Sequence, residues 1–378
     1  MAGLPVAAFE LTVPHLIFGW GSVQRLPQEA GRLGTRPLLV TGRRSLRATG
    51  HLDAIREALE AAGLGVTVFG EVEPEPTLAT VERGLEALRA SGADLVIAVG
   101  GGSALDVGKA IGALAHSPAS VAEHHAGLEI TAAGLPIIAA PTTSGTGSEV
   151  TPNSVLTEPQ DLVKASIRGG GLLPRLALVD PELTVSCPPR ETAYAGLDAL
   201  VQALEAFTSR GAGPATDALA REAFRHIAVH LPAAYRDGTD RAAREHVSLG
   251  SLLAGIALAA ARLGLVHGLA HPIGALYGIP HGLCCALLMP LVMRYNAEVA
   301  AAKYAVLEQS IGLRPGGLEG WFVELRGELG VTETLRGRGL AEADFDRIIP
   351  AALASGSTKH NPRGVTHAEL RQVLRSAL

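Results

Sequence analysis

The sequence predicts an α/β domain with a mostly parallel sheet, followed by an all-helical domain. Two observations support this order. Short apolar runs alternate with amphipathic helical stretches up to about Leu183, and no strand pattern follows that point. The length of 378 residues also suits two domains. We therefore expect the α/β domain in residues 1–185 and the helical domain in residues 186–378.

The elements of the first domain follow from local patterns of apolar residues. Periods of two predict strands and periods near 3.6 predict helices. Strands are expected at 37–40, 66–69, 95–99 and 135–140, and helices at 52–62 and 78–90. Pro188-Pro189 suits the first turn of a helix, and long Ala- and Leu-rich stretches continue from Glu191 to the C-terminus.

Composition and charge exclude several classes of protein. Apolar residues make up 47% of the chain, charged residues 18%, and the net charge is −5. These values are typical of an ordered globular protein and argue against broad binding to nucleic acid or an anionic membrane. The most apolar stretch, 252–293, contains Arg262 and three histidines, so we expect no membrane span. Three cysteines without a CxxC motif, and no basic-apolar leader, predict a cytoplasmic protein.

Two glycine-rich loops follow successive predicted strands. The first, Val99 to Lys109, reads VGGGSALDVGK, and the second, Pro141 to Glu149, reads PTTSGTGSE. Glycine lets the backbone approach a pyrophosphate, and a helix N-terminus supplies free N–H groups. The spacing is not GxGxxG, so a glycine-rich turn that only packs stays an alternative for the first loop. Together the loops predict a Rossmann-like dinucleotide site at the carboxyl edge of the sheet.

Polar side chains cluster in the apolar helical half. Asp198 and Gln202 are four residues apart, as are His267 and His271, and His281 follows after Pro280. Residues four apart share one helix face, and buried polar groups are costly unless paired or ligated. Histidine and carboxylate ligands suit Zn2+ and Fe2+. The alternative is a set of satisfied core residues; Glu205 is interpreted as a packing or salt-bridge group, and Cys284-Cys285 as core.

These motifs together resemble the iron-containing (group III) alcohol dehydrogenase family, whose relatives include maleylacetate reductases and glycerol dehydrogenases. The resemblance spans nearly the whole chain. It includes Phe18–Ser22, Glu73–Thr77, the two glycine-rich loops, Lys164, Val179–Leu183, Gly196–Asp198, the histidine block and Asn361–Arg363.

The resemblance implies NAD or NADP in the N-terminal domain and a role for each matching residue. Gly101, Gly102 and Ser103 are expected at the pyrophosphate, and Asn153 on the substrate side of the nicotinamide. The full expected set also contains Gly42, Arg43, Ser45, Asp106, Thr142, Thr143, Thr146 and Lys164.

For the helical domain, the resemblance implies a metal bound by one aspartate and three histidines. These positions fall at Asp198, residue 202, His267 and His281. His271 matches a histidine that relays the alcohol proton, so His271, His267 and Asp198 form the expected catalytic set. A homo-oligomer is expected as well.

The sequence departs from the family pattern at two places. Residue 202 is Gln202, and an amide oxygen is a weaker ligand than imidazole, so bound Fe2+ or Zn2+ is placed in doubt. Many NAD-dependent members carry an aspartate after the first strand. Here Gly42, Arg43, Arg44 and Ser45 stand there, which favours the 2′-phosphate of NADP.

The predicted function is NAD(P)-dependent hydride transfer between nicotinamide and a small alcohol or carbonyl substrate. One alternative is a metal-independent enzyme like maleylacetate reductase acting on an anionic oxoacid, with Lys359 and Arg363 as candidate anion ligands. A second alternative, from another class, is an inactive dinucleotide-binding protein in which Gln202 marks decay. Retention of Asp198 and the three histidines argues against that alternative.

Overall fold

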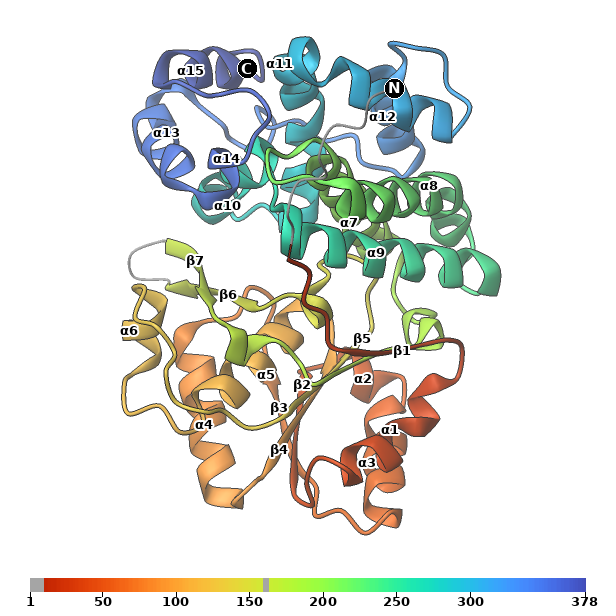
Figure 1. Ribbon diagram of the computed structural model, residues 1–378, viewed down its shortest axis with the longest axis vertical. Helices are drawn as coiled ribbons and strands as arrows, with labels where there is room; N and C mark the ends of the chain where they lie inside the picture. The colour runs from red at the N-terminus through yellow and green to blue at the C-terminus, as the bar shows by residue number, and fades with distance from the viewer. Residues whose placement is uncertain (1–9, 159–162) are drawn as a thin grey trace, which may run out of the picture. The chain divides into compact units, whose positions relative to one another are not determined.

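The computed structural model describes residues 10–158 and 163–378, and the chain divides into two compact units. The α/β unit runs from Val13 to Cys187. The helical unit comprises Pro188–Leu378, with which the described residues 10–12 are grouped. Figure 1 labels most of the helices and strands of both units.

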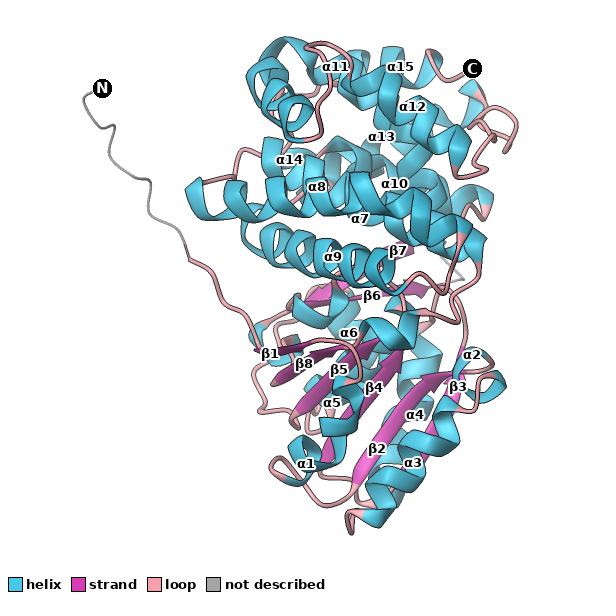
Figure 2. Cartoon of the chain, turned by 90° about the vertical axis from the view of Figure 1, so that its right-hand side faces the viewer, coloured by secondary structure: helices cyan, strands magenta, loops and turns pink. Residues whose placement is uncertain are grey.

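The α/β unit is built on a six-stranded sheet with the order β1-β8-β5-β4-β2-β3. Every neighbouring pair in this sheet is parallel, as predicted (Figure 2). The four expected strands are present within two residues of their predicted starts. The six strands are β1 (His15–Phe18), β2 (Pro37–Gly42), β3 (Thr67–Val72), β4 (Leu95–Gly100), β5 (Ile137–Pro141) and β8 (Leu176–Val179).

Helices cover both faces of this sheet, because alternate strand residues belong to different cores. Leu38 and Val40 of β2 pack with residues of α4 and α5, whereas Leu39 packs with residues of α1 and α3. Parallel sheets bury both faces in this way, so their strands read as continuous apolar runs. The helices are α1 (Leu26–Gly31), α2 (Ser45–Ala48), α3 (His51–Ala61), α4 (Leu78–Ser91), α5 (Gly102–Leu114) and α6 (Val121–His125).

Four strands of this unit were not predicted from the sequence. β1 and β8 pair with each other and have only four residues each, too few to show a period. The other two, β6 (Asn153–Glu158) and β7 (Val163–Arg168), form a separate antiparallel pair.

The first helix of the helical unit, α7, begins at Pro189, within the predicted Pro188-Pro189 start. No strand is found among its described residues, as expected. Its α-helices are α7 (Pro189–Thr208), α8 (Pro214–Arg236), α9 (Arg241–Ala261), α10 (Leu265–Tyr277), α11 (His281–Ser310), α12 (Leu318–Glu328), α13 (Phe345–Ala354), α14 (Gly356–Lys359) and α15 (His367–Arg375). Short 3-10 turns in the two units lie at Ser22–Arg25, Ser148–Val150, Gly170–Leu172, Pro181–Thr184 and Glu342–Asp344.

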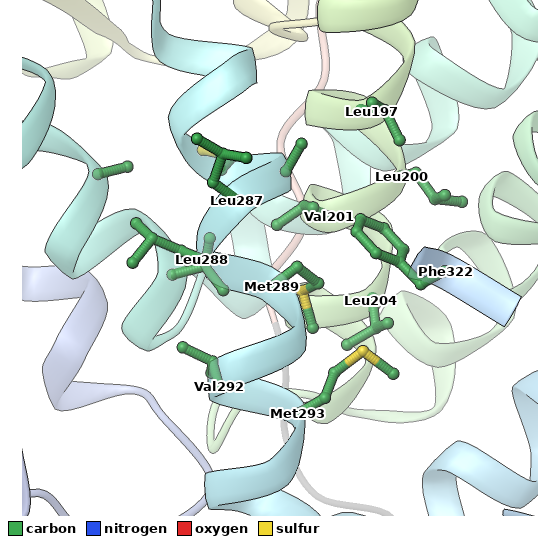
Figure 3. Close-up of a cluster of buried hydrophobic side chains, with 14 of the residues drawn as sticks. Leu197, Leu200, Val201, Leu204, Leu287, Leu288, Met289, Val292, Met293 and Phe322 are labelled. Atoms are coloured by element: carbon green, nitrogen blue, oxygen red, sulfur yellow. The ribbon is translucent and has the colours of Figure 1, made fainter. Parts of the chain in front are cut away.

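The core of the helical unit joins α7 to α11. Leu200 and Leu204 of α7, Met289 and Met293 of α11, and Phe322 of α12 belong to one buried cluster (Figure 3). Full burial of each such side chain contributes about 1.5–3 kcal/mol. These contacts hold together the two helices that carry most of the polar cluster described below.

Among the described residues, α11 is the only individual helix that is long and apolar enough to cross a membrane. Its most apolar window has a mean hydropathy of 1.3, and 72% of that window is buried within the structure. The bent pair α9 and α10 passes the same test only as one broken segment, with an angle of 102° between the helices. The burial of α11 is that of a core helix.

Candidate active site

The two glycine-rich loops meet at the carboxyl edge of the sheet. Strands β5, β4 and β2 are neighbours in that order, and they end at Pro141, Gly100 and Gly42. Since the strands are parallel, the predicted dinucleotide residues that follow them share one edge. The loops are also joined directly, because the Thr142 amide donates to the Gly100 carbonyl at 2.9 Å.

Glycine is required at two positions of the first loop. Gly100 has φ +156°, and a Cβ there would lie 2.7 Å from the Cβ of Ala104. A Cβ on Gly102 would lie 2.6 Å from Cγ2 of Thr146, so the second loop packs against the start of α5. Gly101 has an ordinary φ of −71°, and its Cβ would make only normal contacts with Thr143. A side chain at 101 would therefore mainly affect an approaching ligand.

Behind the loop, α5 carries the fully buried Lys109. Its ammonium donates to the carbonyls of Ser148 at 2.8 Å and Thr151 at 3.2 Å, as well as to that of Asn153. It also lies 3.3 Å from Oδ1 of Asp106. Lys109 thus ties the second loop and the start of β6 to helix α5.

Asp106, which we expected at the dinucleotide, is bonded within the protein. Its Oδ1 accepts from the Ser148 hydroxyl at 2.5 Å, and its Oδ2 accepts from the Val155 amide at 3.1 Å. Nearby Glu149 is buried, and burial raises the pKa of its carboxyl to about 7. Asp106 therefore helps to position the loops, and its place at the dinucleotide stays a prediction.

The basic residues expected near the dinucleotide also have protein partners. Arg43 Nε donates to the Glu71 carbonyl at 2.8 Å, and the guanidinium lies 3.3 Å from Oε2 of Glu73. Lys164 on β7 forms an ion pair with Glu75. Ser45 begins the short helix α2, directly after the β2 turn.

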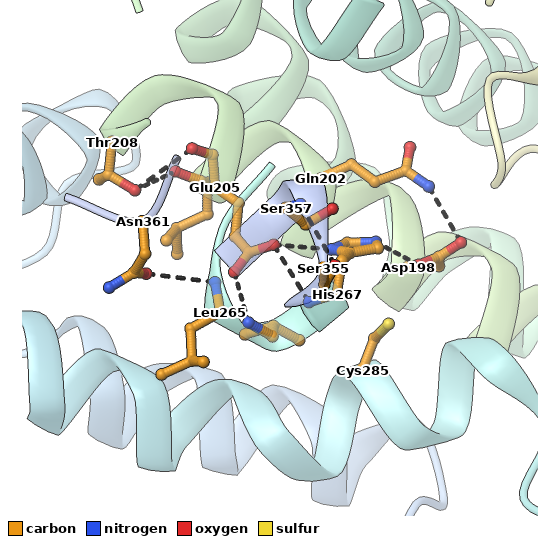
Figure 4. A network of polar contacts seen from close by, with 12 residues as sticks. Asp198, Gln202, Glu205, Thr208, Leu265, His267, Cys285, Ser355, Ser357 and Asn361 are labelled. Atoms are coloured by element: carbon orange, nitrogen blue, oxygen red, sulfur yellow. Dashed lines mark hydrogen bonds and ion pairs between the residues drawn. The ribbon is translucent and has the colours of Figure 1, made fainter. Parts of the chain in front are cut away.

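In the helical unit, three elements bring four potential metal ligands together. Asp198 lies on α7, His267 on α10, and His281 and Cys285 on α11. One ligand atom of each lies within 4.8 Å of the others. Nε2 of His267 is 3.4 Å from Oδ1 of Asp198, and Nε2 of His281 is 3.7 Å from the same oxygen. Figure 4 shows His267 directed at Asp198, with the Cys285 sulfur on the same side.

Glu205 orients His267 from the opposite side of the ring. Its Oε2 lies 2.7 Å from Nδ1 of His267, and its Oε1 accepts from the Val266 amide at 2.7 Å (Figure 4). A carboxylate at Nδ1 fixes the tautomer that leaves Nε2 with a lone pair for a metal. The interpretation of Glu205 as a salt-bridge group was correct, but the sequence alone did not connect it to His267.

Unsatisfied polar atoms show that this site suits a cation. Oδ1 of Asp198, Nε2 of His267 and Oε1 of Gln202 are buried and have no hydrogen-bond partner. Unsatisfied buried polar atoms are rare, and an ion is one of their ordinary explanations. A carboxylate with two imidazoles is a donor set for Zn2+ or Fe2+, so the residues present fit the metal that the resemblance implies.

Gln202 contacts Asp198 through its nitrogen rather than its oxygen. Nε2 of Gln202 donates to Oδ2 of Asp198 at 3.0 Å. This contact leaves Oδ1 of Asp198 facing the two histidines. The expectation that residue 202 is a metal-ligand position stays a prediction, and the structure adds a second role as a support for Asp198.

Titration in the polar cluster follows from burial and from its neighbours. Burial opposes a charge on His267, but Cys285, Asp198 and Glu205 together raise the pKa of His267 well above its usual value. Burial also raises the pKa of the Cys285 thiol to about 12. The carboxylates around His267 therefore favour a positive charge at this place, carried either by a second proton on the ring or by a cation bound at Nε2.

His271 lies at the edge of this cluster. Its ring centroid is 5.3 Å from that of His281, and the two rings meet edge to face. His271 is half-buried, unlike His267, which is 3% exposed. The structure therefore brings together all five polar residues predicted from the helical half.

Cys285 is the residue of this cluster that sequence reasoning missed. It was interpreted as core, and it is indeed fully buried. The available signal was its spacing, because Cys285 is four residues after His281 and so occupies the same helix face.

Comparison with known proteins bears on the identity of the chain. A family model described as iron-containing alcohol dehydrogenase matches residues 14–181, and its C-terminal counterpart matches residues 192–378. The 1,3-propanediol dehydrogenase of Citrobacter freundii is 37% identical, with 98% of each chain covered. The lactaldehyde reductase of Escherichia coli (strain K12) is 35% identical, with 95% of this chain and 97% of that one covered.

A solved structure agrees with these matches. The sulfoacetaldehyde reductase of Bifidobacterium kashiwanohense in complex with NAD+ is 30% identical and superposes with a TM-score of 0.90. The match covers 98% of this chain and 99% of that chain. The sequence-based assignment of fold, enzyme class and family is thereby confirmed: this chain belongs to the iron-containing alcohol dehydrogenase family.

Proposed function

We propose that the protein interconverts small primary alcohols and their aldehydes, with NAD or NADP as the hydride carrier. The observation that carries the proposal is the group of Asp198, His267 and Cys285, all buried, and the half-buried His281, whose ligand atoms lie within 4.8 Å of one another. Asp198, His267 and His281 would hold Zn2+ or Fe2+. The bound cation would polarise a carbonyl oxygen, and the reduced nicotinamide would supply the hydride.

The residues of the chain have separate tasks in this scheme. Gly101, Gly102 and Ser103 would present the N-terminus of α5 to a pyrophosphate, and no side chain caps that end of the helix. Glu205 fixes His267. His271, next to His281, would pass a proton to the substrate oxygen during reduction and take it back during oxidation.

A small neutral substrate is favoured over an anionic oxoacid. Arg363, a candidate anion ligand, lies 3.2 Å from Glu369 and stacks on Tyr295 at 4.5 Å. The other candidate, Lys359, is exposed at the end of the short helix α14. Neither residue offers a buried basic group for a carboxylate substrate. The names of two sequence relatives, which refer to propanediol and lactaldehyde, agree with a short neutral alcohol, whereas the name of the structural relative refers to the anionic sulfoacetaldehyde.

Metal analysis combined with turnover tests this proposal. We expect the purified protein to contain a divalent metal, to reduce lactaldehyde or 3-hydroxypropanal with NADH or NADPH, and to lose activity on chelation. Added Zn2+ or Fe2+ should restore it. Full activity without metal would instead support a metal-independent reductase. Dinucleotide binding without turnover of any aldehyde would support the inactive alternative. A cytoplasmic location and a homo-oligomer stay predictions.

A further inference from the structure

The thiol of Cys285 lies inside the polar cluster, although the sequence pattern gave it no role there. Cys285 is fully buried, and its Sγ lies 3.7 Å from Nε2 of His281. It also belongs to the group whose ligand atoms all lie within 4.8 Å. The thiol is therefore close enough to bind the same cation as the carboxylate and the two imidazoles.

The start of α11 is held close enough to α7 to allow this. A Cβ on Gly282 would lie 2.2 Å from the Tyr194 carbonyl oxygen and 3.4 Å from the Cβ of Asp198. Only glycine permits this approach of the two backbones. His281 and Cys285, one turn apart on α11, are thereby both placed beside Asp198.

Gln202 occupies the position at which the family resemblance implies the remaining histidine, but its amide group is hydrogen-bonded to Asp198. Its Nε2 donates to Oδ2 of Asp198 at 3.0 Å, so this nitrogen cannot face a cation. Turning the amide over to offer Oε1 would lose that bond and would leave Oδ2 of Asp198 without its donor. An amide oxygen is also a poorer ligand for these metals than sulfur or imidazole.

We propose that Cys285 is the fourth protein ligand of the metal site, in place of a ligand at residue 202, and that Gln202 positions Asp198. The proposal rests on the proposed metal-dependent function. On binding, the S–H bond breaks, a sulfur–metal bond forms, and the proton passes to solvent. One carboxylate, two imidazoles and one thiolate form a borderline-to-soft set that favours Zn2+ over Fe2+.

Cobalt substitution gives a readout that does not depend on activity. The full-length protein is stripped with a chelator and titrated with Co2+ alone. We expect one Co2+ per chain and a near-ultraviolet sulfur-to-cobalt charge-transfer band that rises in step with metal uptake. X-ray absorption on the Zn2+ form should show one sulfur at about 2.3 Å beside lighter ligands at about 2.0 Å.

Matched variants separate the thiol from its surroundings. Cys285→Ser should abolish the charge-transfer band and weaken Zn2+ binding at least tenfold. The control, Cys284→Ser, changes the adjacent and equally buried cysteine and should leave the band unchanged. Gln202→Leu should keep the band at full strength per bound cobalt, because the amide is not the ligand.

Three results would overturn the proposal, and they can be told apart. Stoichiometric Co2+ without a sulfur band would remove Cys285 as a ligand while the metal-dependent function stands. A band that survives Cys285→Ser would place the sulfur elsewhere. No uptake of Co2+ or Zn2+ by a correctly folded chain, shown by an unchanged circular dichroism spectrum, would overturn the metal-dependent function as well.

Discussion

The buried charges of the two units are satisfied in different ways. In the α/β unit, Lys109 donates to three backbone carbonyls, and both oxygens of Asp106 accept from the protein. In the helical unit, Oδ1 of Asp198 and Nε2 of His267 are buried without a hydrogen-bond partner. The first arrangement is complete without a ligand, whereas the second is completed by one.

This difference indicates how each site depends on its side chains. The dinucleotide loop is expected to bind its ligand through the backbone, so its most important residues are glycines, which have no side chain to block the ligand. The cluster in the helical unit works through donor atoms, so a single changed side chain alters its chemistry. Variants in one unit should therefore leave ligand binding by the other unit intact, and the predictions below test that separation.

The largest effect is expected from Asp198→Asn. The substitution removes the only carboxylate of the ligand group and should weaken Zn2+ binding at least about a hundredfold, beyond the range typical of groups that only support ligands. NADH affinity should be unchanged. The measurements are metal titration and cofactor fluorescence, with Glu191→Gln, a change at a half-buried residue in the first turn of α7, as the control. An equal loss of affinity for Zn2+ and for NADH would contradict the separation of the sites.

The reciprocal test is Gly101→Val. Because Gly101 has φ −71° and only ordinary contacts around its Cβ, the chain should fold normally. The branched side chain should keep a pyrophosphate from the start of α5 and cost about 1.5–3 kcal/mol, roughly a ten- to hundredfold rise in Kd for the dinucleotide. Metal content should not change. Gly31→Val, at a site with open space, serves as the control; an unaltered Kd would show that this loop only packs.

Glu205→Gln is expected to act through His267. The amide should hold Nδ1 of His267 less firmly and weaken metal binding roughly ten- to hundredfold. Its control is Glu308→Gln, another buried glutamate of the helical unit, whose partner is the Leu318 amide. Both variants should lower Tm, but only Glu205→Gln should change the metal Kd. If the metal Kd rises equally in both variants, Glu205 has only a structural role.

Sequence patterns predicted the elements with long or regular signals. Strands with neighbours on both sides and buried faces, such as β4, carry continuous apolar runs, and Pro188-Pro189 marks the start of α7. The strands β1 and β8 were missed because four residues are too few to show a period. Their pairing with each other joins residues about 160 positions apart, and local periodicity could not have revealed it.

The same limit applies to the polar cluster. Spacing of four residues placed Asp198 with Gln202 and His267 with His271 on shared helix faces, and the structure brings all of them to one place. The contact of Glu205 with His267 joins α7 to α10, and the sequence does not show that the fold brings these two helices together. Cys285 was passed over because buried cysteine is usually core, although its spacing from His281 was available.

The smallest effect is expected at the edge of the dinucleotide site. Arg43 was assigned to a 2′-phosphate, yet its guanidinium lies 3.3 Å from Glu73, and the Arg43 side chain is 55% exposed. Exposed ion pairs of this kind contribute about 0–1 kcal/mol, so a phosphate could draw Arg43 away at little cost. Arg43 should therefore contribute less binding free energy to a 2′-phosphate than an arginine without an ionic partner would. We expect Arg43→Ala to lower the ratio of kcat/KM for NADPH to that for NADH only about three- to tenfold.

Glu73→Gln sharpens this test, because it loosens Arg43 without removing it. The amide can still accept from the Thr80 hydroxyl, which lies 2.6 Å from Oε1 of Glu73, so the turn before α4 should persist. With its ionic partner neutralised, Arg43 should serve a 2′-phosphate better, and the NADPH to NADH ratio should rise. If Arg43→Ala leaves the ratio unchanged while Arg44→Ala lowers it, the phosphate is read by the neighbouring arginine. If neither variant changes the ratio, the absence of an acidic residue after β2 permits NADP without selecting it.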